Sequence, residues 1–193
     1  MIARAEKRRI SNREFLEAVF RDMPSDAAAT TAGFPGDPNA QPLDGPDYRW
    51  AAIPWKLGQS VPERLCSFGP LDRNTYFAIS SFRCDPADGK VRRRKAYFAQ
   101  LHCVMVDDVG TKVHKRKLRL ALSTLIETSP SNFQGFYFIK PTAACKDRVT
   151  CERLIDGMVR SGLTADGADP GMRGVTRYTS VACWHQRQGE VRR

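Results

Sequence analysis

A short apolar run that ends in two consecutive acids constrains the fold of this chain more than any other feature. Residues 102–106 read His-Cys-Val-Met-Val, and Asp107, Asp108, Val109 and Gly110 follow directly. An apolar run of this length predicts a buried strand, and strand ends are where α/β folds place ligands and metals. Two neighbouring carboxylates are costly to bury unless a cation neutralises them. The pattern therefore predicts a strand with a metal site at its end.

The surrounding charge favours this metal site over the simpler interpretation, a solvated Asp-Asp turn. Between Lys90 and Arg119 the chain carries ten basic residues and only these two acids, a net charge of +8 out of +10 for the whole chain. Mg²⁺ and Mn²⁺ prefer carboxylate oxygens and leave coordination positions for phosphate oxygens. An acidic spot within a basic field is what a metal-dependent enzyme acting on nucleic acid requires.

The length of the chain predicts one folded domain, or one domain with an appended arm. With 193 residues, 41% of them hydrophobic and 27% charged, the chain is long enough to bury a core without disulfides. It has no apolar run of about 18 residues for a membrane span and no apolar secretory segment near its first methionine. Its six cysteines are scattered without a C-x-x-C pair, which is typical of reduced thiols. We expect a cytoplasmic protein with polyanionic partners and no membrane contact.

The periodicity of apolar residues favours a mixed α/β or α+β domain. It predicts helices over 11–22 and 146–162 and strands over 74–82, 102–106 and 133–139, whereas 118–126 fits either element. Ser11 followed by Glu14 is the pattern of a capping box, and Val149, Leu154, Ile155, Met158 and Val159 are expected on one apolar face of the second helix. Residues 24–49 hold five of the twelve prolines without periodicity, so we expect an irregular linker there, anchored to the core by Trp50 and Trp55.

Two further segments could contribute to a site near the paired acids. Residues 127–134 read Glu-Thr-Ser-Pro-Ser-Asn-Phe-Gln, and residues 168–178 read Ala-Asp-Pro-Gly-Met-Arg-Gly-Val-Thr-Arg-Tyr. Each segment alone is ordinary turn or loop sequence. A third metal-binding acid could come from Asp169 or Asp166.

In this order, V-D-D-V-G, E-T-S-P-S-N-F-Q and A-D-P-G-M-R-G-V-T-R-Y resemble the motifs of the RepB-like primases of plasmids and phages. That family belongs to the archaeo-eukaryotic primase-polymerase superfamily, and the resemblance covers about residues 74–179. It implies a primase-like catalytic core with a mixed or antiparallel RRM-like sheet flanked by helices. The expected division is an arm over 1–70, a catalytic core over 71–179 and an irregular tail over 180–193.

The resemblance also implies roles for individual residues. Asp107 and Asp108 match the catalytic, metal-binding acids, and Asp169 is the choice for the third acid, with Asp166 second. The nucleotide-binding motif falls on Ser131, Asn132 and Gln134, where the glutamine stands in place of the histidine that relatives usually carry.

The implied activity is metal-assisted nucleotidyl transfer that makes primers during DNA replication, with Mg²⁺ or Mn²⁺ as the cofactor. The expected partners are a single-stranded DNA template, nucleoside triphosphates and a replicative helicase, in the cytoplasm of a bacterial host of the phage or plasmid. Arg177 and Lys112 would clamp the triphosphate. The run Arg92, Arg93, Arg94 and Lys95 would follow the template strand, with a solvated turn as the alternative for this run.

Two other classes of function compete with a primase. A non-catalytic module that binds a single strand or a replication origin would explain the positive charge, but it leaves the paired acids without a role. A metal-dependent nuclease or a rolling-circle initiator is the other candidate. The initiator would need a His-x-His metal pair, and this sequence contains none.

The end of the chain departs from the family pattern. Relatives continue with Arg-Leu-Pro-Gly or Arg-Leu-Pro-Val-Gly, whereas residues 180–193 read Ser-Val-Ala-Cys-Trp-His-Gln-Arg-Gln-Gly-Glu-Val-Arg-Arg without apolar periodicity. Read one base further along from Val181, the permitted codons can spell Leu-Pro-Val-Gly-Ile-Asn-Gly-Lys. We therefore expect a frameshift near Thr179 and Ser180, and a disordered tail after it.

Overall fold

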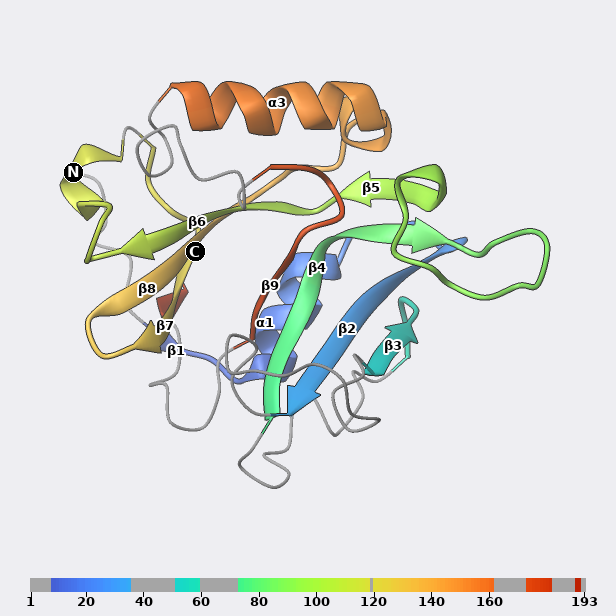
Figure 1. The fold of residues 1–193 in the computed structure, drawn as a ribbon, viewed down its shortest axis with the longest axis horizontal. Helices are drawn as coiled ribbons and strands as arrows, with labels where there is room; N and C mark the ends of the chain where they lie inside the picture. Colours follow the sequence, from blue (N-terminus) through green and yellow to red (C-terminus); the bar gives the residue numbers. More distant parts are fainter. Residues whose placement is uncertain are drawn as a thin grey trace.

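The computed structural model describes residues 8–35, 51–59, 73–118, 120–161, 173–181 and 190–191. Within these ranges the chain forms an α+β fold of antiparallel strands with two α-helices, α1 (Asn12–Phe20) and α3 (Arg148–Arg160), as Figure 1 shows. The strands are β1 (Arg8–Arg9), β2 (Ala27–Pro35), β3 (Ala51–Trp55), β4 (Arg73–Arg83), β5 (Phe98–Leu101), β6 (Cys103–Val109), β7 (Thr124–Ser129), β8 (Asn132–Phe138), β9 (Tyr178–Ser180) and β10 (Glu190–Val191). The α+β fold class expected from the sequence is confirmed.

The strands belong to two five-stranded sheets. One sheet has the order β1-β10-β7-β8-β6, and the other has the order β3-β2-β4-β5, with β9 also paired to β4. His102, the single residue between β5 and β6, joins the sheets. Its N–H donates to the Ile79 carbonyl at 3.0 Å, and its carbonyl accepts from the Ile139 N–H at 2.9 Å. The strand that carries the paired acids is thereby tied to both sheets.

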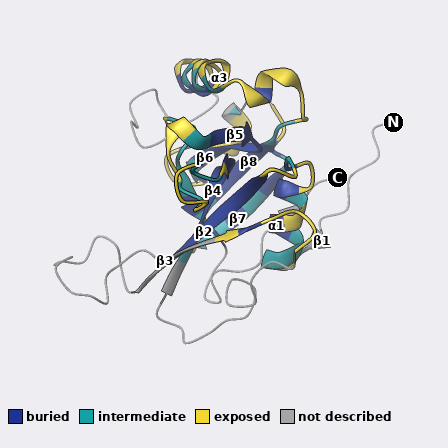
Figure 2. Ribbon diagram, turned by 90° about the vertical axis from the view of Figure 1, so that its right-hand side faces the viewer, coloured by how far each residue is buried: buried dark blue, intermediate teal, exposed yellow. Residues whose placement is uncertain are grey.

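Helix α1 packs against both sheets and closes the core. Ser11 and Glu14 form the predicted capping box, in which the Glu14 N–H donates to Ser11 Oγ at 3.2 Å and the Ser11 N–H donates to Glu14 Oε2 at 2.9 Å. The Phe15 ring lies 5.4 Å from Phe77 of β4 and 5.4 Å from Phe136 of β8, both in edge-to-face geometry. The buried residues in Figure 2 accordingly lie on the strands and on one face of the helix.

The expectation of an irregular linker over 24–49 is wrong for residues 27–35, which form β2. This strand pairs with both β3 and β4. Ala27, Ala28, Ala29, Thr30 and Thr31 are all at most 2% exposed. A strand that is buried on both faces shows no alternation of apolar and polar residues, and its small side chains resemble those of a linker.

Trp55 confirms the expected anchor for this region, and Trp50 lies outside the described residues. The Trp55 side chain is buried, and its ring lies 5.4 Å from Phe20 of α1.

Helix α3 confirms the predicted second helix, with a different apolar face. Asp147 caps it by accepting from the Thr150 N–H at 2.8 Å. Val149 and Leu154 were expected on the buried face but are 43% and 42% exposed, because the helix packs beside β5 through a neighbouring stripe of residues. That stripe consists of Cys151, Ile155, Met158 and Val159.

The expectation of a tail without regular structure is wrong at two points. Strand β9 continues to Ser180, and the buried Val181 donates its N–H to the Thr75 carbonyl at 2.8 Å. Residues 190–191 form β10, which pairs with β1 and β7. Neither helix of the described part of the chain has the length and apolar character needed to cross a membrane.

Candidate active site

A β-bulge turns the two consecutive acids of β6 toward the same side. The register between β6 and β8 shifts between Val106 and Val109, and Asp108 adopts φ 54°. Aspartate tolerates this left-handed conformation better than most residues. In a regular strand, neighbouring side chains point to opposite faces. Here, however, Asp107 and Asp108 contact Gln134 and Asn132, which are two residues apart and share one face of β8.

Asp108 is held as a charged carboxylate. Lys112 Nζ lies 2.7 Å from Asp108 Oδ2, and Asn132 Nδ2 donates to Asp108 Oδ1 at 3.1 Å. The hydrogen bond from Lys112 is the main cause of an Asp108 pKa below its usual value; partial burial opposes this shift and the Asn132 hydrogen bond adds to it. Thr111 Oγ1 donates to Asn132 Oδ1 at 2.8 Å, which orients the amide so that its NH₂ group faces the acid.

Asp107 is fixed by a chain of hydrogen bonds that reaches β9. Its Oδ1 accepts from the Asp108 N–H at 2.9 Å and from Gln134 Nε2 at 3.3 Å. Gln134 Oε1 in turn accepts from Thr179 Oγ1 at 2.9 Å and from the Ser180 N–H at 3.2 Å. Because a backbone N–H can only donate, the Ser180 contact determines which end of the Gln134 amide faces Asp107.

Arg177 completes the cluster from the other sheet. Its Nη2 lies 3.8 Å from Asp107 Oδ2, and its side chain is only 19% exposed. The residue immediately precedes β9, which pairs with β4 and lies between β4 and the β6–β8 pair in Figure 1. Each acid therefore has one oxygen held by an amide of β8 and the other facing a cationic side chain.

Six of the residues predicted to form the site lie together, although they come from segments up to 70 residues apart. They are Asp107, Asp108, Lys112, Asn132, Gln134 and Arg177. Ser131 is exposed in the turn between β7 and β8, where φ is 64° and its N–H donates to Glu127 Oε1 at 3.3 Å. Asp169 and Asp166 lie outside the described residues.

The paired acids fit a divalent cation. Magnesium is commonly held by one or two carboxylates together with water and substrate phosphate oxygens. Asp107 and Asp108 supply two carboxylates on one side of the bulge, each already oriented by hydrogen bonds. Over the described ranges, no group of three or more His, Cys, Asp or Glu side chains could hold a metal. Within this part of the chain, the protein ligands for a cation at this site are therefore the two acids.

The predicted DNA-binding run is partly engaged within the protein. Arg92 forms ion pairs with Asp85 and with Asp88, and one of its bonds to Asp88 is 2.8 Å long. Lys95 Nζ lies 2.7 Å from Glu152 Oε1 of α3. The Lys95 ion pair holds the segment between β4 and β5 against α3, whereas the Arg92 ion pairs lie within that segment.

The two central residues of the run differ from each other. Arg93 donates to the Thr176 carbonyl and lies over the Tyr178 ring, with its Cζ 3.9 Å from the ring centroid. Arg94 is exposed.

Sequence reasoning did not identify Thr111 and Thr179 as parts of the site. Thr111 donates a hydrogen bond to the Asn132 amide, and Thr179 donates one to the Gln134 amide. Each of these amides in turn contacts one of the acids. Both threonines lie next to segments that resemble family motifs. A single threonine carries no signal of a partner on another strand, so only the three-dimensional arrangement shows these contacts.

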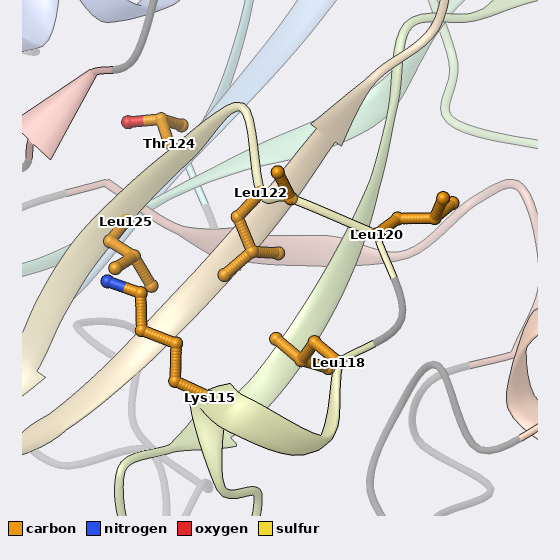
Figure 3. A pocket seen from close by; sticks show the side chains of 7 residues that line it. Lys115, Leu118, Leu120, Leu122, Thr124 and Leu125 are labelled. Atoms are coloured by element: carbon orange, nitrogen blue, oxygen red, sulfur yellow. The ribbon is translucent and has the colours of Figure 1, made fainter. Parts of the chain in front are cut away.

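A cavity of about 240 Å³ lies apart from this cluster, beside β7. Figure 3 shows Leu118, Leu122 and Leu125 gathered around it, with the stem of Lys115 alongside. The lining contains no carboxylate. This cavity therefore does not offer the cation-binding chemistry of Asp107 and Asp108.

Comparison with known proteins gives one structural similarity. No protein-family model and no curated protein matches the chain. The structure is similar to the crystal structure of primase RepB', with a TM-score of 0.49 and 14% sequence identity, over 94% of this chain and 56% of the primase chain. This chain thus spans little more than half the length of that primase. At this identity a similarity concerns the fold alone, and we base the function on the side chains.

Proposed function

We propose that this chain is a primase or primase-polymerase domain, which joins nucleotides on a single-stranded DNA template by metal-assisted nucleotidyl transfer. The observation that carries the proposal is the bulge in β6. It places Asp107 and Asp108 on one side, where Asn132 and Gln134 orient them and Lys112 and Arg177 flank them. All of these residues except Lys112 lie in the segments in which the sequence resembles the motifs of RepB-like primases.

In this proposal the two acids hold Mg²⁺ or Mn²⁺, with Asp169 as the third acid and Asp166 as its alternative. The bound ions would activate the attacking 3′-hydroxyl and neutralise charge on the departing pyrophosphate. The hydrogen bonds from Asn132 and Gln134 keep both carboxylates in place before substrate arrives. Such preorganisation lowers the cost of assembling the site during the reaction.

Lys112 and Arg177 neutralise the acids and would contact the triphosphate. The Lys112 side chain is 76% exposed and ends a flexible stem, so it can move from Asp108 to a phosphate oxygen. The Arg177 side chain is mostly buried, so it offers a fixed cation beside Asp107. Ser131, exposed in the adjacent turn, would add a hydroxyl contact to the nucleotide.

The basic charge of the chain supports a nucleic-acid template as the partner. Within the run from Arg92 to Lys95, the exposed Arg94 is the residue that we expect to contact the template backbone. A replicative helicase is the further partner that the family resemblance implies.

A non-catalytic binding module accounts less well for the acids. Two charged carboxylates on the same side of a strand repel DNA phosphates, and such a module gains nothing from holding them in fixed orientations. A metal-dependent enzyme needs both features.

Primer synthesis tests the proposal directly. The purified chain is incubated with a single-stranded template, labelled ribonucleotides or deoxyribonucleotides, and Mn²⁺ or Mg²⁺. We expect labelled products that require both template and metal. Binding of the template without any product under all four combinations of metal and nucleotide would contradict the proposal and favour a binding module.

A further inference from the structure

Arg93 contacts both neighbours of Arg177. Its guanidinium lies over the Tyr178 ring, with Cζ 3.9 Å from the centroid, and its Nη1 donates to the carbonyl of Thr176. Arg93 and Thr176 are 83 positions apart in the sequence. The Arg93 guanidinium thus contacts the Tyr178 ring with its face and the Thr176 carbonyl with one edge. These two contacts lie on either side of Arg177, the residue that reaches Asp107.

The backbone of Arg177 is also anchored on the side of β4. Its carbonyl accepts from the Ile79 N–H at 3.2 Å, and pairing with β4 begins at the next residue, Tyr178. Arg177 therefore lies where β9 starts, and Arg93 supplies a second anchor for this point of the chain.

We propose that Arg93 is a positioning residue that holds Arg177 at Asp107, and through it the triphosphate site, rather than a contact to the template. This inference rests on the proposed function. A side chain that follows a template has to exchange between phosphates, whereas Arg93 is fixed at two points of the segment that carries Arg177. Planar stacking combined with an in-plane hydrogen bond is a geometry that arginine offers and lysine does not.

The two roles respond differently to conservative substitution. Arg93→Lys keeps the positive charge, so it would restore binding of a DNA phosphate, but it cannot stack and donate in the same plane. Tyr178→Phe keeps the ring face on which the guanidinium lies, whereas Tyr178→Leu removes it.

The test compares these variants by amide hydrogen exchange over residues 176–180 and at Ile79, by the KM for nucleotides, and by affinity for single-stranded DNA. Arg93→Ala and Tyr178→Leu should speed exchange and raise the KM about fivefold or more. The double variant should be no worse than Arg93→Ala alone, because Arg93→Ala already removes both the ring contact and the hydrogen bond to Thr176. Arg93→Lys should restore these properties only in part, and Tyr178→Phe should preserve them.

Arg94→Ala is the matched control for loss of charge, because it removes the same charge from the adjacent position. It should weaken DNA binding and leave exchange in β9 unchanged. The proposal is overturned if Arg93→Ala behaves like Arg94→Ala, or if Arg93→Lys restores every property.

The exchange measurement separates this proposal from the proposed function, because it requires no turnover. If the unmodified protein makes no primers, the proposed function fails, and faster exchange in Arg93→Ala still supports the anchoring of Arg177. If the unmodified protein makes primers and Arg93→Ala changes neither exchange nor KM, the positioning role is wrong and the function stands.

Discussion

His102 makes the stability of this fold depend on pH. The side chain is 3% exposed, and its ring lies 4.9 Å from that of Phe20. Nε2 is 3.0 Å from Ser81 Oγ, and Nδ1 is 3.5 Å from Gln100 Nε2. Burial among these groups lowers the His102 pKa from 6.5 to about 4, although the charge of Asp22 opposes the shift.

The sign and size of the effect follow from this pKa. Between pH 6.5 and about 4 the unfolded chain binds a proton at His102 that the folded protein does not. The free energy of unfolding is therefore highest, as far as His102 is concerned, above pH 6.5, and it decreases as the pH falls toward 4. A pKa difference of about 2.5 corresponds to about 3 kcal/mol of the free energy of unfolding. This is a large part of the stability of an ordinary domain.

The assay is urea unfolding of the original protein and of His102→Gln between pH 7 and pH 4. The substitution changes packing, so the two proteins can differ at pH 7. The carboxylates titrate in both and cancel in the comparison of the pH dependence. We expect the free energy of unfolding to fall by about 3 kcal/mol more in the original protein. Parallel curves across this range would refute the reasoning.

Three further perturbations test other parts of the structure. Gly110→Ala should lower the free energy of unfolding in urea by about 1–3 kcal/mol, because Gly110 has φ 103° and an added Cβ would lie 2.5 Å from the Ser131 carbonyl oxygen. Unchanged stability would show that the turn after β6 relaxes freely. Gln134→Ala should cost about 1–3 kcal/mol and reduce nucleotide incorporation, since it breaks the link between Asp107 and Thr179; full incorporation would mean that Asp107 is oriented without it. Sequencing the gene after Thr179 should show codons that spell the alternative frame, and any other codons would refute the frameshift.

The predictable parts of this fold are those whose signal is local. The capping box at Ser11 and Glu14 depends on two residues three positions apart, so the sequence alone indicates where α1 begins. The apolar run before Asp107 likewise predicts β6. Strand β2 was missed because burial on both faces removes the alternation that reveals a half-buried strand.

Most members of the candidate site were predictable, but its geometry was not. The resemblance to a primase family named Asn132, Gln134 and Arg177 together with the two acids, and the structure brings these side chains into contact. The bulge that turns consecutive acids to the same side depends on pairing with β8. The contact of Arg93 with the segment of Arg177 joins residues far apart in the sequence, so no local pattern distinguishes Arg93 from its basic neighbours.

Nucleotide incorporation by Asp107→Asn and Asp108→Asn tests the central claim most directly. Each asparagine keeps an oxygen that can accept the hydrogen bond from β8 but removes the charge that holds a divalent cation. We expect incorporation on a single-stranded template with Mn²⁺ or Mg²⁺ to fall about a hundredfold or more in each variant. Affinity for the template should be unchanged or higher, because a negative charge is lost from a basic surface. Incorporation at the original rate by either variant would contradict the assignment of these acids as the metal site.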